Sequence, residues 1–353
     1  MNIHSSIDVL RFIALSHIVV ILYLFWKQRR NTLAVVSIFF GLCVIGYLLA
    51  DWTYLQKFPA VHMPILLFPF AAPTLFWLFS KALFDDQFRW NNGLVRLLIA
   101  VILIHYLVYF QYKFHFIPQA ESIDLLLGLL VQLLSLAFIM LGIFEAIHNK
   151  AADLISERLK FRNVFIVVAA SLMAITVLSE VSLAGASPPV FLNLFQKIAI
   201  TGLTLYFSLH LLKLKTGFFP DTAIEATDNQ APSAPVDEGL IERLKDYMEV
   251  RQQWRTEGLS IGKLAENLEV KEYRLRQTIN QHLGYRNFNE YINGFPIREA
   301  CKILADPAKQ HLSILEIAYD LGFASLAPFN KVFKETTGMT PSEWRRSKTI
   351  DLP

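Results

Sequence analysis

Long apolar runs fill about the first two hundred residues of the chain, and short polar pieces such as KQRR, DDQFRWNN and GASPP separate them. About 20 apolar residues cross the hydrocarbon core as a helix, and backbone amides in lipid must be satisfied within the protein. The pattern therefore predicts a bundle of seven transmembrane helices. Pro64, Pro69 and Pro73 predict a kink or a break in the third. The predicted spans cover residues 7–26, 32–50, 63–84, 94–114, 123–147, 163–184 and 190–212.

Positive charge is distributed unevenly between the pieces that separate the spans. Loops on one side, with the stretch after the seventh span, hold twelve Lys and Arg residues, whereas loops on the other side hold only Lys57 and Lys113. Positively charged loops stay in the cytoplasm. We therefore expect a multi-pass protein of the inner (cytoplasmic) membrane, with its N-terminus outside and its C-terminal part in the cytoplasm. The twelve are Lys27, Arg29, Arg30, Lys81, Arg89, Arg96, Lys150, Arg158, Lys160, Arg162, Lys213 and Lys215.

Several polar side chains lie within or beside the predicted spans, where charge is costly and often functional. One interpretation is that they anchor helices at the membrane interface and form hydrogen bonds between helices. The other is a ligand pocket that opens outward. Glu180 and Lys197 lie near the outer ends of the last two spans, so they could form an ion pair. The residues assigned to the pocket are Trp52, Tyr54, His62, His105, Glu180 and Lys197.

Composition changes sharply after residue 236. Residues 1–236 contain 16 Lys and Arg and 13 Asp and Glu, whereas residues 237–353 contain 17 residues of each sign in half the length. Between the two parts, residues 216–236 are rich in Pro, Ala, Thr and Asp, which predicts a flexible linker. We expect a transmembrane domain at residues 1–215, this linker, and a soluble domain at residues 237–353.

The sequence of the soluble part predicts short, capped helices in two similar pairs. Together with the transmembrane helices, this makes the expected fold all-α throughout. Ser260 is placed to cap a helix with an apolar face, and a second helix at about 271–282 follows across a tight turn. Ser313 and Glu316 form a capping box in front of a similar helix. Each pair of helices predicts a helix-turn-helix unit.

The second unit continues past the turn LGF into a helix that Gly338 is placed to end. Thr340 and Glu343 then form another capping box. A helix around 288–305 is expected to join the two units. Two helix-turn-helix units joined in this way have the geometry that enters successive major grooves of DNA.

The stretch IAYDLGFASLAPFNKVFKETTGMTPSEWR resembles the signature of the AraC/XylS family of transcription regulators. It contains the family's Ile-Ala pair, Gly-Phe turn, Phe of the recognition helix, Phe-Lys, Gly, Thr-Pro and aromatic-Arg elements. LSIGKLAENLEV and the helix after it resemble the first unit of the same domain, so the resemblance covers about 237–348. The chain departs from the family at Gly294 and Pro296, where we expect the joining helix to start or to kink at Pro296.

The resemblance implies double-stranded DNA as a partner and places base-reading positions on both recognition helices. Arg276 can bind guanine and Gln277 adenine through paired hydrogen bonds. The second recognition helix is more apolar, so we expect contacts with thymine methyl groups or phosphates. Residues 271–286 and 331–348 each carry a net charge of +3, which favours phosphate contacts. The implied DNA-binding residues are Lys271, Tyr273, Arg274, Arg276, Gln277, Asn280, Leu326, Ala327, Pro328, Lys331 and Lys334.

A membrane bundle followed by such a domain predicts a membrane-tethered one-component transcription regulator that senses a small-molecule or membrane-derived signal. Control would act through homodimerisation or through release of the DNA-binding domain from the cytoplasmic loops of the bundle. The alternative is a transporter or channel with a cytoplasmic regulatory or protein-binding domain. We expect no enzyme, catalytic residue, cofactor or metal, since the predicted spans contain no H-E-x-x-H motif, G-x-S-x-G motif or carboxylate pair at membrane depth. Cys43 and Cys301 fall in different parts, so no disulfide is expected between them.

Overall fold

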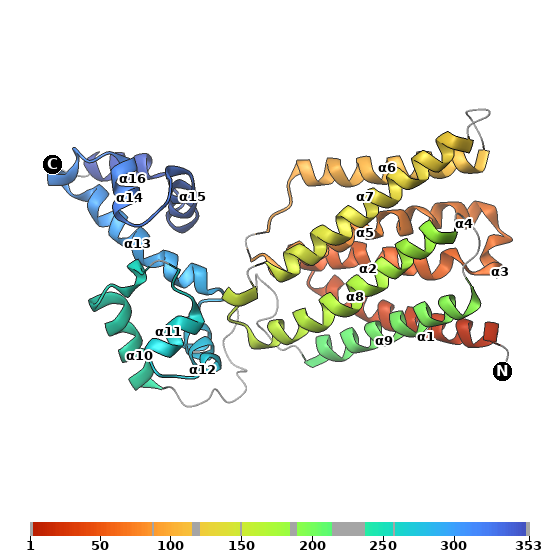
Figure 1. Cartoon of the computed structure of the whole chain (residues 1–353), viewed down its shortest axis with the longest axis horizontal. Coiled ribbons are helices and arrows are strands. Elements are labelled where there is room, and N and C mark those ends of the chain that lie inside the picture. Colours follow the sequence, from red (N-terminus) through yellow and green to blue (C-terminus); the bar gives the residue numbers. More distant parts are fainter. Residues whose placement is uncertain are drawn as a thin grey trace. The chain divides into compact units, whose positions relative to one another are not determined.

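The computed structural model describes residues 3–86, 88–114, 121–148, 150–183, 189–213, 237–256 and 258–350. Within these ranges the secondary structure is helical and contains no β-strand, which confirms the all-α prediction (Figure 1). The chain forms two compact units. The first contains residues 1–149 and 160–229, and the second contains residues 150–159 and 230–353. The predicted linker at 216–236 lies outside the described residues.

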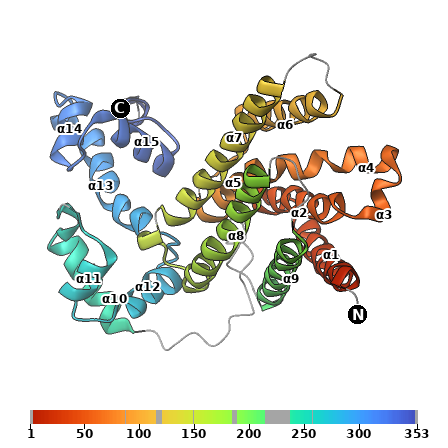
Figure 2. The ribbon, with the colours of Figure 1, turned by 45° about the vertical axis from the view of Figure 1, so that its right-hand side comes forward.

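The first unit is a bundle whose long helices lie side by side (Figures 1 and 2). Within the described residues, six helical stretches are long and apolar enough to cross a membrane. The remaining predicted span, 163–184, falls on the helix α8, where many side chains lie outside the described residues, so the count of seven stays a prediction. The helices are α1 Ile3–Lys27, α2 Thr32–Ala50, α3 Thr53–Gln56, α4 Pro59–Ile65, α5 Leu67–Phe84, α6 Asn92–Phe114, α7 Glu121–Ile147, α8 Ser156–Leu183 and α9 Val190–Lys213.

The proline-rich third span is broken, as the sequence predicts. α4 ends at Ile65, and Leu66 separates it from α5. The Leu66 N–H donates to the carbonyls of His62 and Met63 at 3.3 and 3.2 Å, so the break leaves this amide paired. Gly46 of α2 faces the break, and a Cβ at this position would collide with Phe68. α2 therefore packs closely on the broken span because it carries no side chain there.

Stacked phenylalanine rings form the centre of the bundle. Phe76 of α5 stacks on Phe165 of α8 with the ring centroids 5.6 Å apart, and Phe79 meets the same ring edge-on at 5.5 Å. All three side chains are buried in the main apolar cluster of this unit. Offset and edge-to-face pairs of this kind add to the free energy of burial, so they hold α5 against α8.

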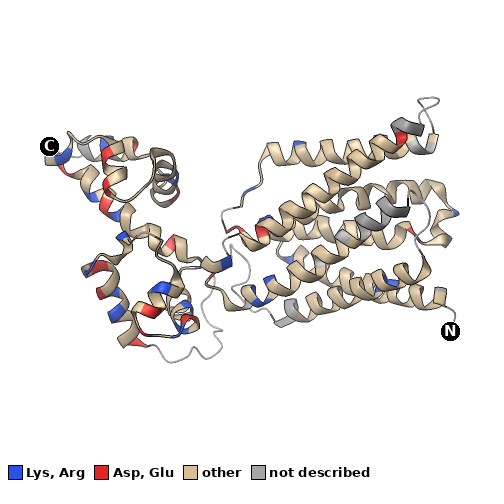
Figure 3. Ribbon diagram, viewed as in Figure 1, with Lys and Arg blue, Asp and Glu red and all other residues tan. Residues whose placement is uncertain are grey.

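The outer surface of the bundle is apolar. Leu107, Val167 and Phe191 are among the many large apolar side chains that the bundle exposes. Figure 3 shows charged residues to be sparse on these helices and frequent on the helices of the second unit. An exposed apolar surface of this extent is typical of a protein that faces lipid.

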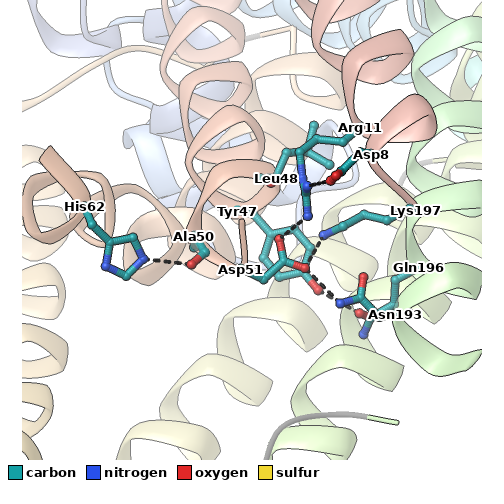
Figure 4. A network of polar contacts seen from close by, with 10 residues as sticks. All are labelled: Asp8, Arg11, Tyr47, Leu48, Ala50, Asp51, His62, Asn193, Gln196 and Lys197. Atoms are coloured by element: carbon teal, nitrogen blue, oxygen red, sulfur yellow. Dashed lines mark hydrogen bonds and ion pairs between the residues drawn. The ribbon is translucent and has the colours of Figure 1, made fainter. Parts of the chain in front are cut away.

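A network of charged side chains joins α1, α2 and α9 (Figure 4). The Asp51 carboxylate accepts from the Arg11 guanidinium at 3.1 Å and pairs with the Lys197 ammonium at 2.9 Å. The Asn193 amide donates to the same carboxylate at 3.0 Å. Arg11 also pairs with Asp8. The side chains of Arg11 and Lys197 are only 3% and 1% exposed, so Asp51 neutralises two buried cations.

The second unit consists of short helices that follow one another closely. Charged side chains are spread over its surface (Figure 3). Its elements are η1 Lys150–Ala152, α10 Glu238–Lys245, η3 Asp246–Val250, η4 Gln253–Arg255, α11 Ile261–Asn267, α12 Glu272–Gln277, η5 Thr278–His282, α13 Phe288–Ala305, η6 Pro307–Lys309, α14 Ile314–Asp320, α15 Leu326–Thr337 and α16 Pro341–Ile350.

One helix, α13, supplies residues to both apolar cores of the second unit. Phe288 and Phe295, in its first half, belong to the core around α11 and α12. Ile297 and Leu304, in its second half, belong to the core around α14 and α15. The helix begins at Phe288, so a start at Pro296 is excluded, while a kink at Pro296 stays a prediction. Pro296 has no N–H to donate a hydrogen bond within the helix. Packing of α13 on both cores stabilises the helical conformation in spite of this loss.

Candidate nucleic-acid interface

The two helix-turn-helix units share the same local structure. Ser260 caps α11 by accepting from the N–H of Lys263, and Ser313 caps α14 by accepting from the N–H of Glu316. Nine residues after each cap the backbone turns into the left-handed region, at Glu269 with φ 55° and at Gly322 with φ 87°. This shared turn leads into α12 in one unit and into α15 in the other, so both are recognition helices by position.

Capping boxes fix the N-terminal ends of α14 and α16, and a glycine ends α15. The Glu316 carboxylate accepts from the N–H of Ser313 at 2.7 Å, and the Glu343 carboxylate accepts from the N–H of Thr340 at 2.7 Å. These backbone hydrogen bonds hold the pKa of both carboxyl groups below the ordinary value. Gly338 ends α15 in the left-handed conformation, with φ 78°. All these caps confirm the sequence prediction.

The first helix-turn-helix unit exposes three of its six predicted DNA-binding side chains to solvent. Tyr273 is 67% exposed, and Lys271 is also exposed at the start of α12. Arg274 is exposed too, but its guanidinium pairs with Asp237, the N-cap residue of α10, at 2.8 Å. Tyr273 and Lys271 are thus accessible to a partner without rearrangement, whereas Arg274 would first have to leave Asp237.

Arg276 is a largely enclosed member of the predicted base-reading set. Its side chain is 13% exposed, and it pairs with Glu272 one helical turn away. Its guanidinium also donates to the backbone carbonyls of Ala151 and Asp153, which belong to the segment 150–159 of the same unit. The sequence places this segment in a loop between two spans, and no local signal indicates its contact with α12.

Gln277 and Asn280 continue the same face of the first recognition helix. The Gln277 amide donates to Gln281 at 3.0 Å across one turn of the helix. The Asn280 amide donates to the backbone carbonyl of Tyr285 at 2.9 Å, which ties the end of η5 to the following loop. Gln277 would therefore lose only its hydrogen bond with the exposed Gln281 if it bound a base. Asn280 has a second role, because its hydrogen bond stabilises the fold.

The second recognition helix divides its predicted residues between the core and the surface. Leu326 is half-buried and packs on the core formed with Phe329 and Phe333. Ala327 and Pro328 are exposed at the start of α15, and Lys331 and Lys334 are exposed further along. The Lys331 ammonium lies 3.9 Å from the Glu335 carboxylate. The exposed apolar start and the two lysines fit contacts with methyl groups and phosphates.

Burial also changes the pKa of two other groups in the second unit, Tyr291 and Cys301. Burial raises the pKa of the Tyr291 hydroxyl and of the Cys301 thiol, so both stay protonated at neutral pH. Among the described residues, no group of three or more His, Cys, Asp and Glu side chains is placed to hold a metal ion.

The bundle of the first unit contains a partly open cavity of about 770 Å³ with a mostly apolar lining. His105, Gln132 and Ser135 are polar residues of its wall. Of the residues assigned to a pocket from the sequence, His105 lines this cavity. The Glu180 side chain lies outside the described residues.

The other predicted pocket residues lie around the Asp51 network and do not line the cavity. The Trp52 ring lies 5.9 Å from the Arg11 guanidinium, and the Tyr54 ring meets the Trp52 ring in a tilted arrangement, with the centroids 5.6 Å apart. His62 hydrogen-bonds to the Ala50 carbonyl at 2.8 Å (Figure 4). Lys197 pairs with Asp51. Among the described residues of the predicted set, the structure therefore separates His105 from Trp52, Tyr54, His62 and Lys197.

Comparison with known proteins gives a family match that lies within the second unit. Residues 264–347 match the family described as a helix-turn-helix domain. The chain is also similar to a protein of Proteus vulgaris described as a probable transcription factor, PqrA, with 28% identity over 113 residues, 32% of this chain and 88% of the relative. No solved structure matches the chain significantly. The resemblance to AraC/XylS regulators is thus confirmed for the C-terminal region.

Proposed function

We propose that the chain is a transcription regulator that binds double-stranded DNA through α12 and α15. The observation that carries this proposal is the repeated helix-turn-helix structure in a region that matches a helix-turn-helix family. A helix presented by such a unit fits the major groove, where base edges can be distinguished. The name of the relative, a probable transcription factor, supports the same function.

Charge on the second unit favours local contacts with phosphates over a long-range attraction to DNA. Residues 237–353 contain 17 basic and 17 acidic residues, whereas the stretches 271–286 and 331–348 are each net +3. The first stretch contains α12, and the second contains the C-terminal part of α15 together with α16 up to residue 348. Affinity should therefore depend on salt through a small number of lysine and arginine contacts at the interface.

Lys334→Ala should weaken binding to all DNA sequences alike. Lys334 is exposed on α15, so its ammonium can reach a phosphate but has no fixed geometry for reading a base. We expect the slope of log affinity against log salt concentration to fall by about 1. The measurement is fluorescence anisotropy of labelled duplexes with the full chain in lipid nanodiscs. Lys302→Ala, on α13, is the matched control, and equal slopes for both variants would contradict the assignment.

Membrane attachment would place this DNA-binding unit beside the chromosome. The apolar surface of the bundle and the excess of positive charge in alternate loops support an N-terminus outside and a cytoplasmic second unit. A cysteine-labelling reagent that does not cross membranes would test this orientation. The second unit must be protected from the reagent in intact cells, because DNA is accessible only from the cytoplasm.

The bundle would sense an apolar or amphipathic molecule in its cavity. A space of about 770 Å³ accommodates a molecule of drug or lipid size. The His105 ring is hydrogen-bonded to Ser135 at 3.0 Å and to the Val101 carbonyl at 2.8 Å, which fixes the ring in the wall. The Gln132 amide has no hydrogen-bond partner among the described residues. An unpaired amide surrounded by lipid-like side chains favours a ligand with a hydrogen-bonding group.

Gly128→Leu should fill part of this cavity and displace its occupant. Gly128 lines the cavity, and a Cβ at this position meets open space. We expect the purified full chain to lose most of the small molecules that accompany it, measured by native mass spectrometry. Gly202→Leu is the control, because Gly202 also has open space but does not line the cavity. Equal retention by both variants would exclude a ligand site here.

A further inference from the structure

The segment 150–159 belongs to the core of the DNA-binding unit. Ala152 and Leu154 are 9% and 2% exposed and pack in the same apolar cluster as Leu275 of α12. The Leu154 N–H donates to the Arg286 carbonyl at 3.0 Å, and Asp153 forms an isolated antiparallel β-bridge with Asn287. The segment therefore docks through both apolar side chains and backbone hydrogen bonds.

The docked segment has a defined conformation of its own. The carboxylate of Asp153 pairs with the guanidinium of Arg158 at 2.7 Å, and both side chains are 1% exposed. The same carboxylate accepts from the N–H of Ile155 at 3.1 Å. A buried ion pair with these additional hydrogen bonds strongly favours one arrangement, because any rearrangement would leave a buried charge unpaired. This arrangement directs the carbonyls of Ala151 and Asp153 at α12.

Arg276 is occupied by these contacts. Nε donates to Glu272 at 2.8 Å, Nη2 donates to the Ala151 carbonyl at 2.8 Å, and Nη1 donates to the Asp153 carbonyl. All three nitrogens of the guanidinium thus have acceptors within the protein. Reading a guanine requires two N–H groups of the guanidinium to point together at O6 and N7. The docked segment leaves the guanidinium without such a pair.

We propose that the segment 150–159 and DNA compete for the same face of α12. This inference rests on the proposed function and adds a regulatory partner, which is a segment of the chain itself. While the segment is docked, Arg276 cannot read a base, and the backbone of 150–159 covers one flank of the recognition helix. The segment follows α7 along the chain and includes the first residues of α8, so a change in the bundle can alter DNA binding by favouring or opposing docking.

Leu154→Ser should raise the affinity of the full chain for DNA. The variant removes the largest buried apolar contact of the segment and leaves every residue of the recognition helices in place. We expect the dissociation constant in nanodiscs to fall about tenfold, as the undocked population rises. The probe is a fluorescent duplex enriched from a random-sequence library with the full chain. Ala151→Ser, at an exposed position that keeps its carbonyl, should leave the affinity within about twofold of the parent.

Hydrogen exchange of the unaltered chain provides a second measurement. Adding the enriched duplex should speed exchange of the Leu154 amide, because DNA would displace the segment and break the hydrogen bond with Arg286. Protection that persists in the DNA complex, or equal affinities for both serine variants, would overturn the competition while leaving DNA binding intact. Failure of the parent and both variants to bind any duplex would instead overturn the proposed function.

Discussion

Phe329→Ala is expected to abolish DNA binding by unfolding the second helix-turn-helix unit. Phe329 is completely buried, and its ring meets Phe323 at 5.1 Å and Phe333 at 5.7 Å between ring centroids. Removing such a side chain costs about 3–5 kcal/mol of unfolding free energy, which is a large share of the stability of a small domain. Hydrogen exchange of the amides in α14 and α15 would measure the loss, alongside anisotropy with labelled DNA.

Tyr319→Ala is the matched control for this prediction. Tyr319 is an aromatic residue of the same unit, on α14, but it is 54% exposed. We expect its removal to change stability by no more than about 0.5 kcal/mol. If both variants retained native exchange and DNA affinity, the aromatic core would not be what holds α15 in place.

Asp51→Ala should destabilise the bundle more than the substitution of any other single charged residue in its described ion pairs. The substitution removes the carboxylate that faces both Arg11 and Lys197, whose side chains are almost fully buried. Leaving a buried charge uncompensated costs about 3–5 kcal/mol. We expect a clear fall in the thermal unfolding temperature of the full chain in detergent micelles. The loss should appear first in contacts between α1, α2 and α9.

Glu145→Gln provides the comparison for Asp51. Glu145 accepts from Lys81 at 3.0 Å, but the Lys81 side chain is 30% exposed and can turn toward water. We therefore expect a loss of about 1 kcal/mol or less. Substituting Arg11 and Lys197 by leucine together with Asp51→Leu should restore most of the lost stability, because no buried charge would then remain unpaired. Equal melting temperatures for the two single variants would contradict the role of Asp51 as a shared counter-ion.

The sequence predicts the features of this protein that depend on neighbouring residues. Capping by Ser260 and the box of Ser313 and Glu316 need only residues three apart, so both could be predicted and both are present. The break in the third span follows from prolines that lack an N–H. The joining helix was expected around 288–305 and is found there.

Features that depend on distant contacts could not be predicted in the same way. Arg11 interrupts the first apolar run, but its partner Asp51 is 40 residues away and appears only once α1 and α2 pack together. Pro296 suggests a helix start, and packing on both cores overrides it. The contact of Arg276 with Asp153 spans 123 residues. A pattern of local periodicity carries no information about such pairs.

Because α13 runs without interruption through both cores, it sets the spacing of the DNA sequence that the protein can read. Its 18 residues span about 27 Å and hold the two helix-turn-helix units at a fixed separation. An operator for this protein should therefore contain two short base motifs that face the same side of the duplex, one for each recognition helix. Five extra base pairs between them would rotate the second motif by about half a turn, beyond the reach of α15.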